Sequence, residues 1–386
     1  MLSKLFYIGC EKMIEIKEVT TKKQLRDFVK FTYRLYEGNP YFVPGIRSDE
    51  YNTLKTDKNP AYEHCKTKLF LAYKDGEIAG KIAVIINDLY TQKWNKKYGR
   101  FGFVDFIEDF EVAKKLFETA ENYLKEQGME GIHGPLGFCD LDPEGMLITG
   151  FERMGTFTTL YNHPYYPEYL SRLGYIKDAE WIEYEVKIPK EVPKSLKSVS
   201  EYAKTRNKVT IREIKDKGDI KEIAPKIFDL INICYKDLYS VVELTEKQIS
   251  YYVKQYFSVL DPKYIRIIED SEGEPIAFGL GFPSLVKTMK KHKGKIFPLG
   301  LFEIMRTLKH PSRLELLLIA VRPDYRRKGI NAILLCEMIE LCNSLNIEFV
   351  DLNPQLVMNF DVRNQWKHFE SNQNKTRAAF FKSLAQ

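Results

Sequence analysis

The chain has 386 residues, enough for two domains, and its 44% hydrophobic and 29% charged residues are ordinary for a globular protein. A formal net charge of +6 is too small at this length to indicate nucleic-acid binding by itself, and no apolar run approaches the roughly 20 residues that cross a bilayer. Six scattered cysteines without a C-x-x-C pair argue against a zinc site or a disulfide framework, so we expect no metal and a cytoplasmic protein.

The N-terminus combines Lys4, a short apolar run and Cys10, which faintly resembles a lipoprotein signal. We expect no export, because the run is shorter than the roughly 7–15 apolar residues that a signal needs. Met13 directly precedes a clean strand pattern. Residues 1–12 are therefore predicted to be an extension upstream of the true start.

The first half alternates strand and helix patterns. Thr21 is a suitable N-cap for the first helix, and Asp75-Gly76 is a strong hairpin signal. The long polar and aromatic loop Gly38–His64 indicates function, because structureless loops of this length are uncommon. The predicted elements are, in order, strand Met13–Val19, helix Thr21–Leu35, strands Lys68–Tyr73, Ile78–Ile86 and Arg100–Ile107, and helix Glu111–Gln127.

The segment Gly131–Phe151 is rich in glycine and acid and is predicted to be irregular. Its carboxylates and the aromatic residues that follow can line a substrate pocket for a cationic amine. The candidate residues are Asp140, Asp142, Glu144, Tyr161 and Asn162. The alternative is that Asp140 or Asp142 caps a helix and that the tyrosines form a domain interface.

A stretch rich in proline and lysine, Ile188–Ser200, indicates a linker, and we place a boundary near residue 190. The second half then repeats the order of the first. Its predicted elements are strand Val209–Ile214, helices Ile220–Tyr239 and Thr245–Leu260, strands Tyr264–Glu269, Pro275–Phe282 and Leu316–Val321, helix Ile330–Leu345, strand Glu348–Leu352, helix Asn359–Glu370 and strand Thr376–Lys382.

The segment Ser284–Arg313 is an insertion before the central strand and carries eight cations against one acid, Glu303. Apolar residues in the same segment indicate that part of it packs. We expect a lid over the substrate or a dock for an anionic one, and a solvated basic face is the alternative. No interleaved aromatic platform supports nucleic-acid binding.

The stretch Leu314–Leu345 combines a strand, a basic glycine turn and a helix. Its apolar run Leu316–Val321 is typical of a strand buried on both faces, and Pro323 ends the strand. The turn Arg326–Asn331 follows, with three cations and a glycine. Because the first N–H groups of a helix lack internal partners and the helix dipole is positive there, this turn predicts a site for an anion, with a polyphosphate favoured.

This turn resembles the acetyl-CoA motif of the GNAT acyltransferase superfamily, Arg/Gln-x-x-Gly-x-Gly/Ala. Arg326 fills the first place and Gly329 the fourth, whereas Asn331 departs from the Gly or Ala of the family. The sequence from Asn162 through a short aromatic helix to Gly174-Tyr175 is similar to the last conserved motif of GNAT folds.

Roughly residues 14–384 resemble tandem-GNAT proteins, a double-domain group of bacterial acetyltransferase-like proteins. The resemblance implies an α/β (α+β) fold with two GNAT-like domains, each a twisted, mixed and mostly antiparallel sheet flanked by helices. The predicted domains are residues 13–190 and 191–386. In the first, the acidic turn Glu108–Glu111 would repel a pyrophosphate, so we expect only the second domain to bind the cofactor.

The resemblance also implies acetyl-CoA as co-substrate, with the pantetheine arm along the backbone of Val321 and the pyrophosphate on the N–H groups of the turn. The implied cofactor-binding residues are Val321, Arg326, Arg327, Lys328, Gly329, Ile330, Asn331 and Ala332. An amine would attack the thioester directly, without a covalent enzyme intermediate.

Glu315 is the candidate catalytic base, because GNAT histone acetyltransferases keep their base glutamate at the head of the same strand. Partial burial would raise its pKa toward neutrality. The alternative is a strand-end glutamate that faces solvent or pairs with Arg313. Asn353, at the end of the next strand, is predicted to orient the substrate.

The family usually places a general-acid tyrosine on the helix after the fifth strand, but no tyrosine lies between Asn359 and Ser371, and water can protonate the thiolate instead. Two rival interpretations are a Fem-like transferase that uses aminoacyl-tRNA and a catalytically inactive GNAT-fold binding protein. Fem-like enzymes lack the pyrophosphate loop, whereas the missing tyrosine and Asn331 favour the inactive protein. The acceptor is expected to be a small-molecule or peptide amine, an antibiotic included, with neither nucleic acid nor a membrane as partner. The acyl length and the oligomeric state stay open.

Overall fold

The computed structural model describes residues 13–256 and 260–385, so the predicted extension over residues 1–12 lies outside the described part of the chain. In the first half, the side chain of Thr21 caps the first helix as predicted, accepting a hydrogen bond from the backbone N–H of Gln24. The elements are β1 (Ile14–Glu18), α1 (Lys22–Leu35), α2 (Arg47–Thr53), β2 (Cys65–Lys74), β3 (Glu77–Asn87), α3 (Asp88–Trp94), β4 (Tyr98–Phe106), α4 (Phe110–Glu126), β5 (Gly131–Gly134), β6 (Met146–Thr149), α5 (Tyr165–Arg172) and β7 (Ile176–Lys187).

The second half continues with α6 (Lys194–Asn207), β8 (Thr210–Arg212), α7 (Lys217–Tyr235), α8 (Glu246–Tyr256), β9 (Ile265–Glu269), β10 (Pro275–Pro283), α9 (Val286–Lys291), α10 (Leu299–Lys309), β11 (Leu314–Val321), α11 (Ile330–Ser344), β12 (Phe349–Leu352), β13 (Gln355–Leu356), α12 (Phe360–Asn364) and β14 (Ser371–Ser383). Short 3-10 turns span Pro60–Glu63, Pro262–Tyr264, Pro323–Tyr325 and Gln365–His368. None of the helices in the described ranges is long and apolar enough to span a membrane.

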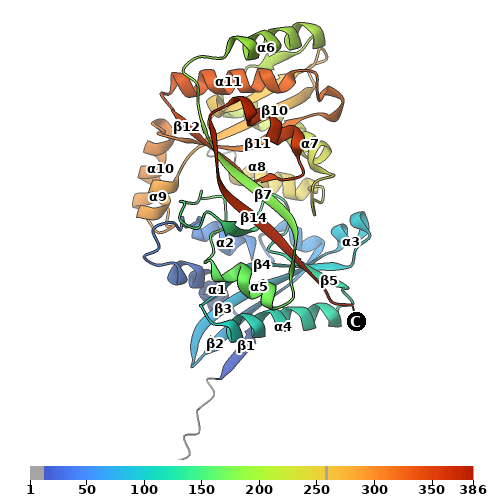
Figure 1. Ribbon diagram of the computed structural model, residues 1–386, viewed down its shortest axis with the longest axis vertical. Helices are drawn as coiled ribbons and strands as arrows, with labels where there is room; N and C mark the ends of the chain where they lie inside the picture. Colours follow the sequence, from blue (N-terminus) through green and yellow to red (C-terminus); the bar gives the residue numbers. More distant parts are fainter. Residues whose placement is uncertain (1–12, 257–259, 386) are drawn as a thin grey trace, which may run out of the picture.

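The strands form one mixed sheet with the order β1-β2-β3-β4-β5-β14-β7-β12-β11-β10-β9-β8, while β6 pairs with β14 and β13 pairs with β7. The pairs β4–β5 and β11–β12 are parallel, and the other pairs are antiparallel. Each half therefore repeats a run of antiparallel strands that ends in one parallel pair. Figure 1 shows the halves stacked along the long axis with helices beside the sheet, which confirms the predicted mixed α/β architecture.

The strands β7 and β14 join the halves, and Figure 1 shows them running side by side across the middle of the molecule. Although β14 comes from the end of the chain, it pairs with β5 of the first half as well as with β7. A buried charge cluster links the two strands, because Glu183 of β7 binds both Lys375 (2.9 Å) and Arg377 of β14. The sheet is therefore continuous across residue 190.

Several segments differ from the prediction. Gly131–Phe151 is not wholly irregular, since it contains β5 and β6, whose partner is the distant β14. The loop Gly38–His64 contains α2 and a 3-10 turn. Helix α7 begins at Lys217, before the predicted Ile220, because the side chain of Asp216 accepts hydrogen bonds from two N–H groups of the first turn. The last strand is also longer than predicted.

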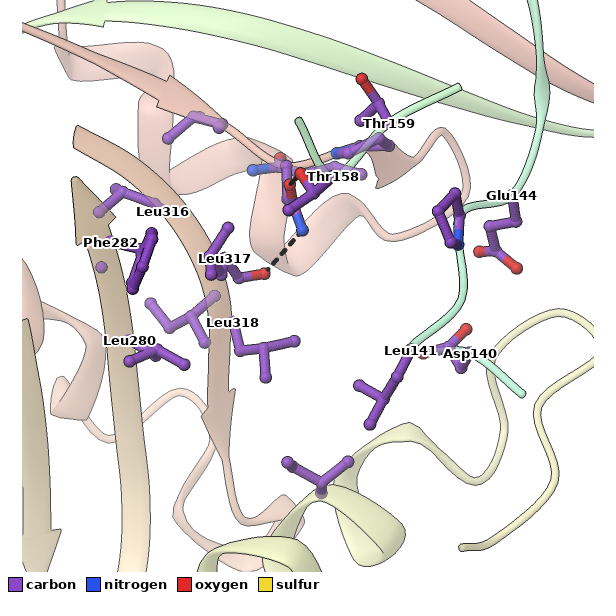
Figure 2. A pocket seen from close by; sticks show the side chains of 18 of the residues that line it. Asp140, Leu141, Glu144, Thr158, Thr159, Leu280, Phe282, Leu316, Leu317 and Leu318 are labelled. Carbon is purple, nitrogen blue, oxygen red and sulfur yellow. Dashed lines mark hydrogen bonds between the residues drawn. The ribbon is translucent and has the colours of Figure 1, made fainter. Parts of the chain in front are cut away.

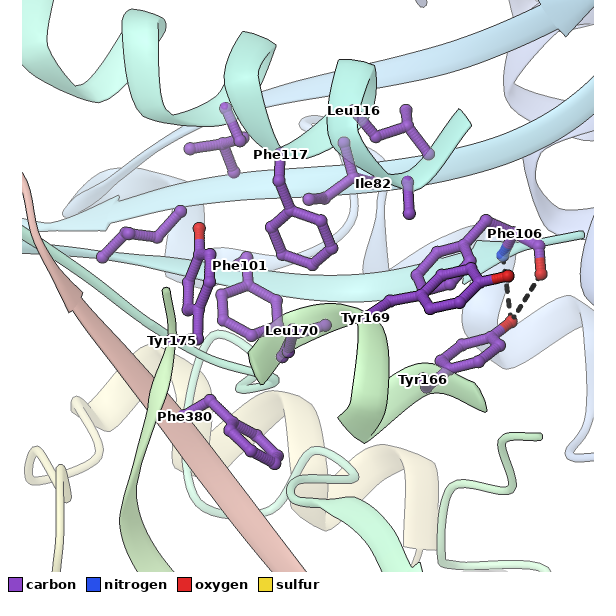
Figure 3. Packing of buried hydrophobic residues seen from close by; sticks show 14 of the residues in the cluster. Ile82, Phe101, Phe106, Leu116, Phe117, Tyr166, Tyr169, Leu170, Tyr175 and Phe380 are labelled. Carbon is purple, nitrogen blue, oxygen red and sulfur yellow. Dashed lines mark hydrogen bonds between the residues drawn. The ribbon is translucent and has the colours of Figure 1, made fainter. Parts of the chain in front are cut away.

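The core of the first half lies between α4, α5 and the sheet, and it is strongly aromatic (Figure 3). Phe101, Phe106 and Phe117 are fully buried there. The hydroxyl of Tyr166 accepts a hydrogen bond from the backbone N–H of Phe106 (2.9 Å) and donates to the carboxylate of Asp105 (3.2 Å). This packing fixes α5 and the loop before it against β4, which positions one wall of the cavity described below.

Candidate functional site

The turn between β11 and α11 exposes a row of backbone donors. Gly329 is the N-cap of α11 with φ +81°, and Arg327 also has a positive φ of 60°. No side chain caps the helix. Among the described residues, the backbone N–H groups from Arg327 to Asn331 have no hydrogen-bond acceptor. These donors lie at the positive end of the helix dipole, beside three exposed cations, which are the features that an anion site needs.

Neighbouring elements hold this turn in place. Arg326 donates to the backbone carbonyl oxygens of Val321 (3.2 Å) and Cys234 (3.2 Å), so its side chain braces the turn against β11 and α7. Helix α6 packs on the other side, where a Cβ atom on Gly329 would lie 3.0 Å from the Cβ of Ala203. Both the backbone angle and this close approach therefore favour glycine at position 329.

The corresponding turn of the first half is chemically different. Asp109 is the N-cap of α4, and its carboxylate accepts hydrogen bonds from the N–H groups of Glu111 (3.0 Å) and Val112 (3.4 Å). The same carboxylate pairs with Lys74 of β2. The first half therefore uses its own carboxylate at the helix start, where the second half leaves its N–H groups without a capping side chain.

The strands β11 and β12 separate beside this turn. They pair in parallel only from Leu314 to Leu316, while β11 continues to Val321. At the point of separation, a register shift leaves Leu317 without a partner on β10. Asn353 supplies a hydrogen-bond partner there, because its side chain donates to the carbonyl oxygen of Leu317 (3.1 Å). The same side chain accepts from the hydroxyl of Thr158 (3.2 Å) in the first half.

A cavity of about 1160 Å³ runs from the turn into the space between the halves. Its walls come from both halves and are mostly apolar. It brings together most of the predicted site: Asp140, Tyr161, Asn162, Val321, Arg326, Arg327, Gly329, Ile330, Asn331 and Asn353 line it. Three other predicted residues, Glu315, Lys328 and Ala332, do not line it.

Asp140 and Glu144 lie on one side of this cavity, opposite Leu316–Leu318 of β11 (Figure 2), and Asp142 also lines it. Burial raises the pKa of Asp140 and that of Asp142 to about 6. Burial is the main cause that raises the pKa of Glu144 well above its usual range, and the negative charge of Asp140 is the second. Asp140 and Glu144 therefore form an electrostatically coupled pair of carboxyl groups in an otherwise apolar space.

The carboxylates differ in their hydrogen bonds. Asp142 accepts from the backbone N–H groups of Phe138 (2.7 Å) and Cys139 (3.3 Å), so it has the local capping role of the alternative interpretation, at a turn rather than a helix. Asp140 and Glu144 accept no hydrogen bond from the described residues. They are the carboxylates that remain available to a ligand.

The predicted substrate residues Tyr161 and Asn162 mainly serve the structure. Asn162 is 4% exposed and its amide binds both the N–H (2.7 Å) and the carbonyl oxygen (3.0 Å) of Leu147. Tyr161 donates to the carbonyl oxygen of Phe151 (3.2 Å). These bonds explain why the segment before α5 holds a defined shape along the cavity wall.

Glu315 is buried at the head of β11, with 1% of its surface exposed. One carboxyl oxygen accepts from the hydroxyl of Ser284 (2.8 Å), and the other, Oε2, has no partner among the described residues. Burial raises its pKa to about 8. The predicted alternative, a pair with Arg313, is wrong, because Arg313 pairs instead with Asp351 and Glu185.

A second polar cluster on the cavity wall was not predicted. Lys81 of β3 is 1% exposed and lies 3.0 Å from the carboxylate of Glu50 and 3.6 Å from that of Asp105. Asp105 also accepts from the hydroxyl of Thr32 (2.6 Å). The signal in the sequence is a lysine inside the apolar run Ile78–Ile86, because a buried lysine needs a charged partner.

Comparisons with known proteins agree with this geometry. Residues 225–365 match the Acetyltransferase (GNAT) family. The chain is 26% identical to Protein YghO of Escherichia coli K12 over 349 residues, which cover 88% of each protein. It is 23% identical to Bacterial ceramide synthase of Caulobacter vibrioides over 303 residues, 77% of each.

Solved structures show the same fold. A tandem GNAT protein from the clavulanic acid biosynthesis pathway aligns with 97% of this chain and 99% of its own, with a TM-score of 0.55 and 9% identity. A GCN5-related N-acetyltransferase from Sphaerobacter thermophilus aligns over 97% and 96% of the two chains, with a TM-score of 0.51 and 9% identity. The second half therefore matches the Acetyltransferase (GNAT) family, and the chain along its length has a tandem GNAT fold.

Proposed function

We propose that the protein is an acyl-CoA-dependent N-acyltransferase whose acceptor is the amine of a largely apolar molecule. The observation that supports this most directly is that one cavity joins two kinds of site. The free N–H groups from Arg327 to Asn331 lie at one end of it, and the carboxyl groups of Asp140 and Glu144 lie on its wall.

The turn has the features that a CoA pyrophosphate requires. It offers backbone donors, a helix start without its own capping side chain, and exposed cations. Beside it, the separation of β11 from β12 leaves β11 from Leu317 to Val321 without a partner strand on that edge. Three of its carbonyl oxygens, those of Leu317, Ile319 and Val321, already accept hydrogen bonds from side chains. An extended pantetheine arm can lie along this edge and place its thioester near Asn353, where the strands part.

The carboxyl pair has the features that an amine acceptor requires. A carboxylate attracts an ammonium group, and a pKa raised toward neutrality makes it a better base for the same proton. In the proposed step, Asp140 takes a proton from the ammonium, and the nitrogen lone pair attacks the thioester carbon. The C–N bond forms, the C–S bond breaks, and the thiolate leaves with a proton from a donor on the wall. The nitrogen then loses its second proton as the neutral amide forms, and this proton returns to the wall donor.

Tyr235 is our candidate for that donor. It lines the cavity from α7, and its hydroxyl donates to the carbonyl oxygen of Ile319 on β11 (3.0 Å). Burial raises its pKa above the ordinary value, so it stays protonated at neutral pH. This residue would supply the function of the tyrosine that the segment from Asn359 to Ser371 lacks.

The size and character of the cavity support an acceptor or an acyl group with a long aliphatic part. Acetyl-CoA is the donor that the sequence motif favours, but about 1160 Å³ is far more space than an acetyl group fills. The wall opposite Asp140 is apolar and carries Leu280, Phe282 and Leu316–Leu318 (Figure 2). The relative named Bacterial ceramide synthase carries a lipid product in its name, which supports the same substrate class.

The test begins with donor binding. Thermal melting with acetyl-CoA and with a long-chain acyl-CoA is compared for the wild type, Gly329→Asp and Gly329→Ala. Ligand at about 100 times its Kd stabilises by roughly 2.7 kcal/mol. We expect this stabilisation in the wild type and its loss in Gly329→Asp, which adds a negative charge at the helix start.

Gly329→Ala separates backbone strain from charge, and Gly273→Asp is the control for the substitution itself. Gly273 has φ +79° in a turn with nothing within 4 Å, so it shares the strain but not the site. Release of free thiol is then measured with a panel of long-chain and short amines. Stabilisation without thiol release would identify an inactive binding protein, and no stabilisation by either donor would overturn the proposal.

A further inference from the structure

The start of α10 and the turn before it expose a cluster of large apolar side chains. Phe297, Leu299, Phe302 and Met305 are 78%, 72%, 75% and 62% exposed, and Leu301 is 39% exposed. Single exposed apolar residues are normal, but five of them within nine positions are not. Leu299, Phe302 and Met305 follow each other at a spacing of three and so share one face of the helix. These five residues are called the α10 apolar surface.

Cations surround this surface. Lys287, Lys295, Arg306 and Lys309 are exposed, and no carboxylate of the described residues lies within ion-pair distance of them. The single acid of the segment, Glu303, already pairs with Lys291 (2.9 Å) and contacts the ring nitrogen Nε2 of His292 (2.6 Å). The surface therefore presents apolar side chains within a rim of unpaired positive charge.

The inner side of the same segment belongs to the cavity wall. Ile296, Leu301 and Ile304 line the cavity. Leu301 is both on this wall and 39% exposed, so the α10 apolar surface is continuous with the cavity interior. Figure 1 places α9 and α10 at the outer edge of the second half, where a flat partner can reach them.

We propose that the α10 apolar surface docks on an anionic lipid bilayer. Bulky apolar residues on one helix face with lysine and arginine around them are the pattern of a helix that lies in the interface of a membrane. The unpaired cations match the negative charge of such a bilayer. Continuity with an apolar cavity favours a lipid surface over an acidic protein, because an aliphatic molecule can then pass from bilayer to cavity without crossing water.

This proposal differs from the expectation, drawn from the lack of an apolar run long enough to cross a bilayer, that no membrane is involved. Docking at the interface needs no membrane-spanning segment. The choice of a lipid surface rests in part on the aliphatic substrate of the proposed function, but its test does not, because vesicle binding is measured without substrate or donor.

The experiment is co-sedimentation of the full chain with vesicles of neutral phosphatidylcholine and with vesicles that also contain phosphatidylglycerol. We expect binding to the anionic vesicles that falls as salt is raised, and little binding to the neutral ones. Lys295→Glu/Lys309→Glu should weaken the binding by at least about tenfold, since each cation near an anionic surface contributes about fivefold. Phe297→Ser/Phe302→Ser should abolish it.

Matched variants keep the test specific. Lys115→Glu/Lys125→Glu changes the net charge by the same amount on α4, and Ile176→Ser removes a 65% exposed apolar residue far along the chain. Both should bind vesicles like the wild type. Melting temperatures of all variants show whether each is folded.

Three results would overturn the proposal. One is equal loss of binding in the α10 and control variants, and another is no binding to anionic vesicles. The third is a dimer in sedimentation velocity that Phe297→Ser/Phe302→Ser dissociates, because the surface would then be an interface between two copies of the chain.

Discussion

Asn353 donates a side-chain hydrogen bond to the carbonyl oxygen of Leu317, 3.1 Å away, at the point where β12 leaves β11. This carbonyl belongs to the residue that the register between β10 and β11 skips. One side chain therefore satisfies the irregular position of the central strand and holds open the space beside it. The same side chain accepts from Thr158, which ties the opening to the first half.

Asn353→Ala should destabilise the fold and weaken donor binding. The carbonyl oxygen of Leu317 would be left without its partner, at a cost of about 1–3 kcal/mol in the free energy of unfolding. Thr158→Val is the control, because it removes the bond to Asn353 Oδ1 and the bond to the hydroxyl of Thr156 but leaves the carbonyl oxygen of Leu317 with its donor. Urea unfolding that shows no greater loss for Asn353→Ala than for Thr158→Val would contradict this role.

The pH dependence of kcat/KM distinguishes the two candidate bases. A general base must be ionised, so the rate rises as pH passes its pKa in the free enzyme. That rise is expected near pH 6 for Asp140 and near pH 8 for Glu315. We expect Asp140→Asn to lower kcat/KM by about 10²–10⁴-fold and to remove the rise near pH 6.

Asp142→Asn is the matched control for this experiment, because the pKa of Asp142 is also about 6 but its carboxylate is engaged by a turn. It should keep the shape of the pH profile. A rise near pH 8 that disappears in Glu315→Gln would instead assign the base to Glu315.

Glu315 should also make stability depend on pH. Its pKa of about 8 in the folded chain lies above the ordinary value of 4.5, so the folded state binds the proton more tightly than the unfolded state. Between about pH 4.5 and 8 the folded chain holds more protons, and the free energy of unfolding falls as pH rises through this window.

Glu315→Gln removes this titration. Urea unfolding is measured at about pH 5, 7 and 9. The free energy of unfolding of Glu315→Gln, relative to that of the wild type, should rise with pH by several kcal/mol over the whole window. Glu213 is exposed, so Glu213→Gln is the control, and its free energy of unfolding should depend on pH as that of the wild type does. A constant difference between wild type and Glu315→Gln would mean that the carboxyl group is not titrating in this range.

Tyr235→Phe tests the proposed proton donor. The change leaves the cavity wall in place but removes the hydroxyl, so kcat should fall with little change in the stabilisation by acyl-CoA. General acid catalysis typically contributes about 10²–10⁴-fold. Acyl donors whose leaving-group thiol has a lower pKa should need less help from a proton donor. If they do not restore kcat of Tyr235→Phe relative to the wild type, the hydroxyl has a structural role through its bond to Ile319 instead.

The strand, turn and helix around Arg326–Asn331 could be predicted because the sequence pattern that specifies them is local. Arg326, Gly329 and the apolar pattern around them lie within one stretch, and strand, turn and helix follow each other directly. Asp140 could be proposed for the pocket because an acidic segment without apolar periodicity stands out in the sequence. The bracing of Arg326 on Cys234, by contrast, joins positions that no local pattern connects.

The strand β5 and the cluster around Lys81 could not be predicted, because both depend on contacts between residues that are distant in the sequence. The four-residue strand β5 has no alternation to recognise, and its pairing depends on Phe380 and Phe381 of β14. The cluster around Lys81 likewise depends on Glu50 in a helix inside a predicted loop. In both cases the deciding partner is distant in the chain and becomes a neighbour only after the sheet has formed.

The position of β14 sets an order for folding in the cell. A ribosome produces β14 after every strand with which it pairs, so β5 and β7 have open edges throughout synthesis. The sheet of the first half is therefore complete only after β14 has been synthesised and has paired with β5 and β7. Until β14 has paired, the growing protein exposes unpaired strand edges. Such edges promote aggregation and are bound by molecular chaperones.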